Sequence, residues 1–94
     1  MDIPKRVIVR VKDCEFEDFC QDFELPTRMP IRDLSKGILK LLKVYGPNGE
    51  WDKESRYAKK ISLSLFYNEI KLQNDQTLAS VGIWDGSIIG FRAS

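Results

Sequence analysis

The segment from residue 30 to residue 45 has the spacing of one long amphipathic helix, and it limits most strongly how this chain can fold. Pro30 suits the first turn of a helix, and Gly46 and Pro47 suit its end. At about 100° per residue, the apolar side chains of the segment fall within an arc of roughly 100°. The members of this arc are Ile31, Leu34, Ile38, Leu41, Leu42 and Tyr45. Burying the arc requires a sheet, which the rest of the chain must supply.

Two segments before the helix have the pattern of strands. Residues 5–12 alternate between apolar and polar side chains, so that Val7, Val9 and Val11 share one face. Residues 19–25 continue with a second apolar face, which is interrupted by a glutamine and therefore indicates a bulge or a local shift. These two segments predict a hairpin that one side of the helix can cover.

Three further segments with strand patterns follow the helix. Residues 61–67 alternate, and the inward set is Ile61, Leu63, Leu65 and Tyr67. Residues 70–72 predict a short strand, and residues 87–92 predict a last strand with Ile89 and Phe91 inward. The chain therefore supplies strand segments on both sides of its one helix.

The order strand, strand, helix, strand, short strand, strand predicts an α+β fold in which a mixed sheet wraps one helix, the β-grasp arrangement. Periodicity alone does not separate this arrangement from other two-layer α+β folds. A length of 94 residues predicts a single domain over residues 1–94. Residues 46–60 are polar and rich in turn formers, and they predict a long exposed loop within that domain.

Charge and hydropathy disfavour several classes of partner. The net charge of +1 provides no overall attraction to nucleic acid or to anionic lipid. No apolar run approaches the roughly 18 residues of a membrane span, so we expect no direct membrane insertion. Residues 1–6 lack the apolar centre of an export signal, which favours a cytoplasmic location.

Catalytic and metal chemistry are not predicted either. The chain has no histidine, and it contains no phosphate-binding glycine loop or nucleophile motif. Cys14 and Cys20 are expected to be free thiols, because a disulfide between them would close only a small loop. The acidic run from Asp13 to Glu24 lacks the spacing and the glycine of a calcium loop and is expected to be solvated. We therefore expect no enzymatic activity, no cofactor and no bound metal.

Two segments carry a resemblance to a known family. Residues 23–34, FELPTRMPIRDL, have the pattern Leu-Pro, a short spacer, Pro, an aliphatic residue, two residues and Leu. Residues 74–86, NDQTLASVGIWDG, have a Thr-Leu, Gly-Ile and Asp-Gly pattern that ubiquitin shares more loosely. Both segments resemble the YukD family and the N-terminal ubiquitin-like domain of EccD proteins. The resemblance covers most of residues 5–92 and is weakest at 13–18 and 46–60.

This resemblance implies a ubiquitin-like β-grasp fold and a bacterial, cytoplasmic protein that is encoded with a type VII (WXG100, ESX-like) secretion apparatus. It implies a non-covalent interaction module whose protein partners are components of that apparatus. Nothing in the chain resembles the transmembrane part of EccD, so a stand-alone protein is expected. The sequence printed ends at Ala93-Ser94 without a Gly-Gly pair, which agrees with the expectation that the protein is not conjugated.

Two alternatives to this function remain open. A ubiquitin-like sulfur carrier or modifier with an atypical C-terminus would share the fold but would need a glycine end that an activating enzyme can use. A nucleic-acid-binding module would need a basic face with interleaved aromatic side chains.

The first candidate binding surface is centred on Phe66, which stands on the serine-rich outward face of its strand. Alignment through Thr77 and Leu78 gives it the place of the outward aliphatic residue in the recognition patch of ubiquitin. The expected neighbours of this residue on other strands are Gly90, Arg92, Ile88, Ile8 and Arg10. Two other roles for Phe66 stay open, because it could simply cover Gly90 or could lie beneath the 46–60 loop.

The second candidate surface is a basic stripe on the helix. It comprises Arg32, Lys36, Lys40 and Lys43, with Leu39 expected to be exposed among them. An ordinary solvated helix face is the alternative interpretation. Because the first hairpin is acidic and this stripe is basic, head-to-tail contact in a homo-oligomer is a further expectation. Trp51 and Trp84 are each expected either in a contact surface or against the edge of the sheet.

Overall fold

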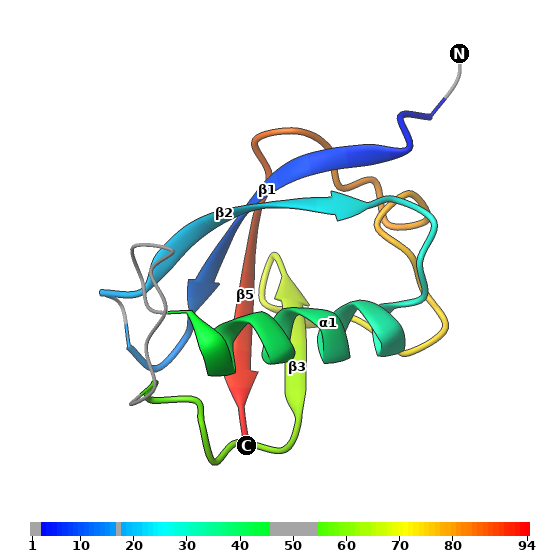
Figure 1. Cartoon of the computed structure of the whole chain (residues 1–94). Helices are drawn as coiled ribbons and strands as arrows, with labels where there is room; N and C mark the ends of the chain where they lie inside the picture. The colour runs from blue at the N-terminus through cyan, green and yellow to red at the C-terminus, as the bar shows by residue number, and fades with distance from the viewer. Residues whose placement is uncertain (1–2, 17, 46–54) are drawn as a thin grey trace.

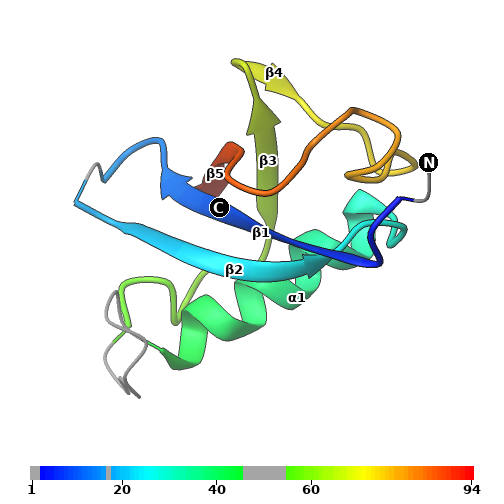
Figure 2. The same ribbon diagram turned by 90° about the horizontal axis from the view of Figure 1, so that it is seen from above.

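The computed structural model describes residues 3–16, 18–45 and 55–94, and within them one helix lies against one sheet. The elements are β1 (Arg6–Asp13), β2 (Cys20–Pro26), α1 (Ile31–Val44), β3 (Leu63–Tyr67), β4 (Ile70–Lys71) and β5 (Ile88–Ala93). The sheet has five strands in the order β2-β1-β5-β3-β4. Figure 1 shows α1 lying across this curved sheet, and Figure 2 shows the same arrangement from above.

Strand directions make the sheet mixed. β1 pairs with β5 in parallel, whereas the pairs β1–β2, β3–β5 and β3–β4 are antiparallel. The first and last strands are therefore neighbours within the sheet, and the helix crosses one face of it. The β-grasp arrangement predicted from the order of elements is confirmed.

Alternation along the strands divides the sheet into an inner and an outer face. The inner side chains of β1 are Val7, Val9 and Val11, all buried, as the sequence predicted. Ile89 and Phe91 of β5 and Leu65 of β3 continue the same buried layer. Burying each of these side chains contributes about 1.5–3 kcal/mol relative to leaving it exposed, so this layer provides most of the driving force for folding.

The helix buries a different side from the one that its apolar arc predicted. Leu39 is only 7% exposed, whereas Leu41 and Tyr45 are each 42% exposed. The buried set is Ile31, Leu34, Ser35, Ile38, Leu39 and Leu42, which is turned by roughly 40° about the helix axis from the predicted arc. The prediction was wrong because the curled sheet reaches past the apolar arc on the β3 side, whereas β2 does not cover the opposite flank of the helix.

Two strand predictions also need correction. β2 pairs with β1 in one uninterrupted register from Arg6–Pro26 to Lys12–Cys20, so the bulge expected at Gln21 is not formed. Ile61 was expected to face inward, but β3 begins at Leu63 and Ile61 is 86% exposed. An alternating pattern does not show at which residue a strand begins to pair, which is why Ile61 was misplaced. It also does not show that a half-buried polar side chain such as Gln21 fits within a regular strand.

Backbone carbonyls close the N-terminus of the helix. The N–H groups of Ile31 and Arg32 donate to the carbonyl oxygens of Gln76 and Asn74, at 2.8 and 3.2 Å. Pro30 occupies the N-cap position, and Tyr45 follows the last helical residue. Since the first free N–H groups already have partners, this end of α1 offers no anion-binding site.

The end of the 46–60 segment enters the core, contrary to the exposed loop that its polar composition predicted. Tyr57 is buried, and its ring packs edge-on against Phe19 and Phe91 at centroid distances of 5.5 and 5.6 Å. Its hydroxyl donates to Oδ2 of the buried Asp13 at 2.6 Å, and Oδ1 of Asp13 accepts from the N–H of Glu15. Residues 46–54 of the predicted loop lie outside the described residues.

Neighbouring contacts hold the same segment from both sides. The hydroxyl of Ser55 donates to the carbonyl of Leu42 at the end of the helix. The Arg56 guanidinium makes two hydrogen bonds of 3.1 Å to Asp18 and lies over the Phe16 ring. Its hydrogen bond holds the pKa of Asp18 below the ordinary value. Asp13 was expected to be solvated with the rest of the acidic run, and this expectation was wrong because Tyr57 closes over it.

Tyr57→Phe tests the buried hydrogen bond. The substitution keeps the aromatic packing but leaves Oδ2 of the buried Asp13 without its donor. We expect the free energy of unfolding to fall by about 1.5–3 kcal/mol, measured by urea denaturation. Tyr67→Phe is the matched control, because within the described residues the Tyr67 hydroxyl donates no hydrogen bond, and it should change stability far less. Equal effects of the two substitutions would contradict a special role for the Asp13–Tyr57 pair.

Stability should also decline in alkaline solution because of this tyrosine. Burial, assisted by the hydrogen bond to Asp13, raises the pKa of Tyr57 above its ordinary value of 10.0. The unfolded chain therefore loses this proton near pH 10 while the folded chain keeps it, so the contribution to stability is complete below pH 10 and is lost above it. The slope of unfolding free energy against pH above pH 10 should be steeper in the native protein than in Tyr57→Phe by up to about 1.4 kcal/mol per pH unit.

Candidate functional site

The outer face of the sheet brings together the residues predicted around Phe66. Phe66 lies directly opposite Gly90, and Ser64 lies opposite Arg92, in the β3–β5 pair. Ile88 lies beside Arg10 in the parallel pair of β5 with β1. Ile8 stands two residues before Arg10 on the same face of β1. The predicted cross-strand neighbours of Phe66 thus share one surface, on the side of the sheet away from α1.

Two shallow hollows lie on this outer face and share Ile88. One, of about 460 Å³, is lined by Lys12, Asp13, Cys14, Phe66, Asn68, Glu69, Ile88 and Gly90. The other, of about 430 Å³, is lined by Ile8, Arg10, Asp22, Asp85, Gly86 and Ile88. Ile8 and Ile88 are 52% and 56% exposed, so the two hollows form a continuous surface with apolar side chains at its middle. Exposed apolar side chains that cluster in this way are typical of a contact surface.

Gly90 keeps this surface concave. A Cβ atom added at Gly90 would lie only 2.8 Å from Sγ of Cys14 and 3.8 Å from the carbonyl oxygen of Lys12. Cys14 reaches this place because its N–H donates to the carbonyl of Phe91 at 3.0 Å, which extends the β1–β5 pairing past the end of β1. Phe66 is half-buried opposite the glycine, so it covers Gly90 in part and still lines the hollow.

Charged groups of both signs surround the apolar centre. Arg10 donates to Asp22 at 3.1 Å across the two outer-face positions, and this hydrogen bond raises the pKa of the Arg10 guanidinium. Oδ1 of Asp85 accepts a hydrogen bond from the N–H of Ile8 at 2.7 Å, which holds the turn before β5 against β1. An apolar centre within a mixed polar rim is the usual composition of a protein–protein contact.

The turn residues that line the hollows were missed by the sequence interpretation. Asn68 and Glu69 both have positive φ, 51° and 65°, as a tight hairpin between β3 and β4 requires. Cys14, Asn68, Glu69 and Asp85 reach the outer face only because each turn folds back onto it. The signal in the sequence that could have predicted these lining residues is their position next to the ends of strands that carry the predicted outer face.

The basic stripe on the helix lies on the other side of the molecule. Arg32, Lys36 and Lys40 are exposed on α1, which covers the inner face of the sheet, so they cannot share one contact surface with Phe66. Arg32 also forms an exposed ion pair with Asp33 at 3.5 Å. Leu39 was expected to be exposed within the stripe, and its burial removes it from any contact surface.

The acidic hairpin is less negative than its sequence indicated. Glu24 pairs with Arg6 at 3.2 Å, Asp22 with Arg10 and Asp18 with Arg56, all at exposed positions. These pairs weaken the charge contrast on which the expectation of head-to-tail contact depended. Within the described part of the chain, no group of three acidic or sulfur-bearing side chains could hold a metal ion. Trp84 is half-exposed beside the Asp85 turn, whereas Trp51 lies outside the described residues.

Cys14 and Cys20 are free thiols in the structure, and both residues are exposed. The last residues are paired rather than projecting, because Ser94 donates to the carbonyl of Ser62 and accepts from Ile61. In residues 3–16, 18–45 and 55–94, no helix is long and apolar enough to cross a membrane.

The fold and this surface define a ubiquitin-like β-grasp protein, and comparison with known proteins shows which family it represents. The family model described as "WXG100 protein secretion system (Wss), protein YukD" matches residues 7–90. The chain belongs to this family, which is a ubiquitin-like, non-enzymatic module associated with WXG100 secretion systems. The predicted family and the predicted absence of enzymatic activity are confirmed. No curated protein matches the chain.

Solved structures confirm the fold. The ubiquitin of Caldiarchaeum subterraneum has a TM-score of 0.66 at 13% identity, with coverage of 95% of this chain and 94% of that one. An N-terminal ubiquitin-like domain determined in solution has a TM-score of 0.67 at 22% identity, covering 98% and 78%. A chain of the MycP5-free ESX-5 inner membrane complex gives 0.69 at 20% identity, and the match covers 97% of this chain but 21% of that one.

Paired substitutions at adjacent residues test the assignment of the outer face. Phe66→Asp introduces a carboxylate on the outer face beside Lys71, the cross-strand neighbour of Phe66 on β4. We expect the variant to fold and its melting temperature to change by only a few degrees. Leu65→Asp buries a carboxylate in the core and should prevent folding, as followed by circular dichroism. Loss of folding in Phe66→Asp would show that this residue belongs to the core.

Proposed function

We propose that this protein is a non-conjugated protein-interaction module and acts as an accessory or regulatory component of a WXG100 (type VII-like) secretion system. Residues 1–94 act as one ubiquitin-like domain in the cytoplasm. The outer face defined by Phe66, Ile88, Gly90, Arg92 and Ile8 binds a protein component of that system. The observation that carries the proposal is the continuous apolar surface centred on Ile88, on a chain of the YukD family.

The composition of this surface supports a protein partner. Covering the exposed side chains of Ile8 and Ile88 removes apolar surface from water, and the absence of a side chain at Gly90 accommodates the Cys14 thiol at the edge of this surface. Cations and carboxylates alternate around this centre, so a partner can complement both signs. Ile8 and Ile88 are about half exposed, so covering both would contribute about 2–3 kcal/mol, to which contacts of the polar rim must add.

The same surface is unsuited to nucleic acid. Arg10, Lys12 and Arg92 would favour a phosphate backbone, but Asp22, Asp85 and Glu69 line the same hollows and would repel it. Among the described residues of this face, Phe66 is also half-buried opposite Gly90, so no open platform for stacking bases is formed. The outer face therefore favours protein over nucleic acid.

Two observations support the remaining parts of the proposal. Exposed free thiols at Cys14 and Cys20 suit a reducing compartment such as the cytoplasm. Arg32, Lys36 and Lys40 form a separate basic surface on α1, which is available to a second acidic partner when the outer face is occupied.

Isolation of the protein from its own bacterium tests this function. Ile88→Asp and Phe66→Asp, introduced together, should reduce the recovery of co-purifying secretion-system components by about tenfold or more, because carboxylates replace the apolar contact. Secretion of a WXG100 protein, measured by immunoblot of culture medium, should decline in parallel.

Ile61→Asp is the matched control, because Ile61 is more exposed than Ile88 and lies on neither hollow. It should leave both recovery and secretion unchanged. Normal recovery with the folded double variant would show that the outer face is not the contact surface. Absence of secretion-system components from the native isolate would contradict the accessory role itself.

A further inference from the structure

A second apolar surface, not assigned above, lies between strand β2 and helix α1. In Figure 1, β2 and α1 run in similar directions, and in Figure 2 they are closest near the end of β2 and diverge toward its start; β2 is at the edge of the sheet. One hollow of about 240 Å³ lies near the start of β2 and is lined by Gln21, Phe23, Leu41, Leu42 and Tyr45. Another, of about 790 Å³, lies beyond the other end of β2 and is lined by Ile3, Lys5, Pro26, Arg28, Met29, Pro30 and Asp33.

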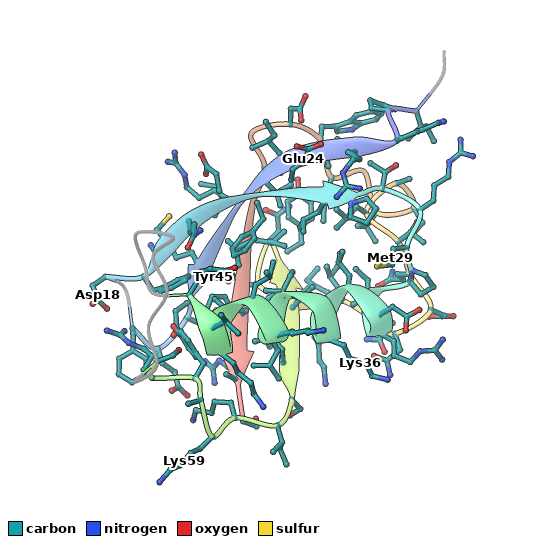
Figure 3. The ribbon with its side chains drawn as sticks, in the orientation of Figure 1. Asp18, Glu24, Met29, Lys36, Tyr45 and Lys59 are labelled. Atoms are coloured by element: carbon teal, nitrogen blue, oxygen red, sulfur yellow. The ribbon has the colours of Figure 1, made fainter. Side chains whose placement is uncertain are left out.

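The two hollows share no lining residue, and they lie at the two ends of the flank between β2 and α1, which we call the β2–α1 groove. Tyr45 and Met29 stand at opposite ends of α1 in Figure 3. Between them lies Gly37, about 40° from Leu41 around the helix axis, where an added Cβ would meet nothing within 4 Å. Exposed apolar side chains are concentrated here, since Ile3, Met29, Leu41 and Tyr45 are all more than one-third exposed. Strand β2, which borders both hollows, is about 23 Å long for its seven residues.

The pattern of hydrogen bonds shows which backbone groups of β2 face this groove. The N–H of Thr27 donates to the carbonyl of Lys5, and the N–H of Asp13 donates to the carbonyl of Phe19. In both cases the two residues stand directly opposite each other in the β1–β2 register. In an antiparallel register, bonded pairs recur at every second residue, so the odd-numbered residues of β2 are bonded to β1. The N–H and C=O groups of Cys20, Asp22 and Glu24 therefore point away from the sheet, and within the described residues no backbone group pairs with them.

We propose that the β2–α1 groove binds an extended segment of a partner protein, which pairs with β2 as an additional edge strand. Its main chain would bond to the free groups of Cys20, Asp22 and Glu24. Alternate side chains would enter the groove and contact Phe23, Leu41 and Tyr45, so they must be apolar. Strand addition at an exposed sheet edge is a general mode of peptide recognition, in which the backbone provides affinity and alternate pockets provide specificity.

Charge selects the remaining side chains of this segment. Asp22 and Glu24 form the outermost column of the outward face, with Arg10 and Arg6 paired to them on the β1 side, so cations at the alternate positions of the segment would contact these carboxylates from the free side. A second copy of this chain does not supply these cations, because two β2 strands would place their carboxylates next to each other. The occupant is therefore a strand in which lysine or arginine alternates with apolar residues. The apolar part of this groove is distinct from the outer face, which it meets at Asp22, and neither proposal depends on the other.

A synthetic peptide provides the direct test. The probe is a blocked heptapeptide in which lysine and valine alternate, and the control peptide has the same composition with its valines grouped together. Both are titrated into isotope-labelled full chain and followed by amide NMR. The alternating peptide should shift the amide signals of Phe23, Leu41 and Tyr45 and slow hydrogen exchange at Asp22 and Glu24. Equal binding of both peptides, no binding, or shifts at Ile88 instead would overturn the proposal.

Matched substitutions locate the binding. Leu41→Lys places a cation in the groove and should weaken the alternating peptide by about tenfold, whereas Ile61→Lys, the same change outside the groove, should not. Glu24→Lys should weaken it by repulsion, whereas Asp75→Lys, at another exposed carboxylate, should have little effect. Equal affinities within either pair would contradict the proposal.

Hydrogen exchange in the protein without peptide tests whether the chain itself or a second copy covers the edge of β2. Without peptide, the amides of Asp22 and Glu24 should exchange rapidly, and the amide of Phe23, which is bonded to β1, should exchange slowly. Slow exchange of Asp22 and Glu24 in dilute solution would show that the chain itself covers its edge. Protection that increases with protein concentration would show that a second copy does so. Either result would overturn the proposal of a partner strand.

Discussion

Parallel pairing of β1 with β5 is the interaction on which the rest of the structure depends. It joins the first and last strands of the chain, and through them it joins the β1–β2 hairpin to β3 and β4 in one sheet. On the inner face it aligns Val11 with Ile89 in the core that the helix covers. On the outer face it places Ile88 beside Arg10, close to Ile8. The core and the candidate contact surface therefore lie on opposite faces of the sheet that the β1–β5 pairing holds together.

The sheet covers the two sides of helix α1 to different extents. The β3 side of α1 is covered so fully that Leu39 is buried, whereas the β2 side leaves Leu41 and Tyr45 half-exposed. Tyr57 fills the end of the layer next to β1, where its hydroxyl satisfies the buried Asp13 carboxylate. A sheet that curls tightly on one flank necessarily opens a groove on the other, and the free edge of β2 borders that groove.

Division of exposed groups between surfaces gives the protein several separate contact regions. The outer face and the basic side of α1 lie on opposite sides of the fold, and the β2–α1 groove meets the outer face at Asp22, so a substitution away from Asp22 in one region should leave the others intact. For a member of a secretion-associated family, separate surfaces would allow one small protein to hold two components together.

The sequence by itself determined the elements, their order and the two faces of most strands, because alternation and helical spacing are local properties. It thereby placed Phe66, Ile88, Gly90 and Arg92 on one outward face, and the segments around Pro30 and Thr77 indicated the family. Only the tertiary structure decided the burial of Leu39 and Tyr57, the exposure of Leu41 and Ile61, and the free edge of β2. The reason is physical: burial depends on how far the sheet curls and which strand lies at its edge, and no local pattern records either.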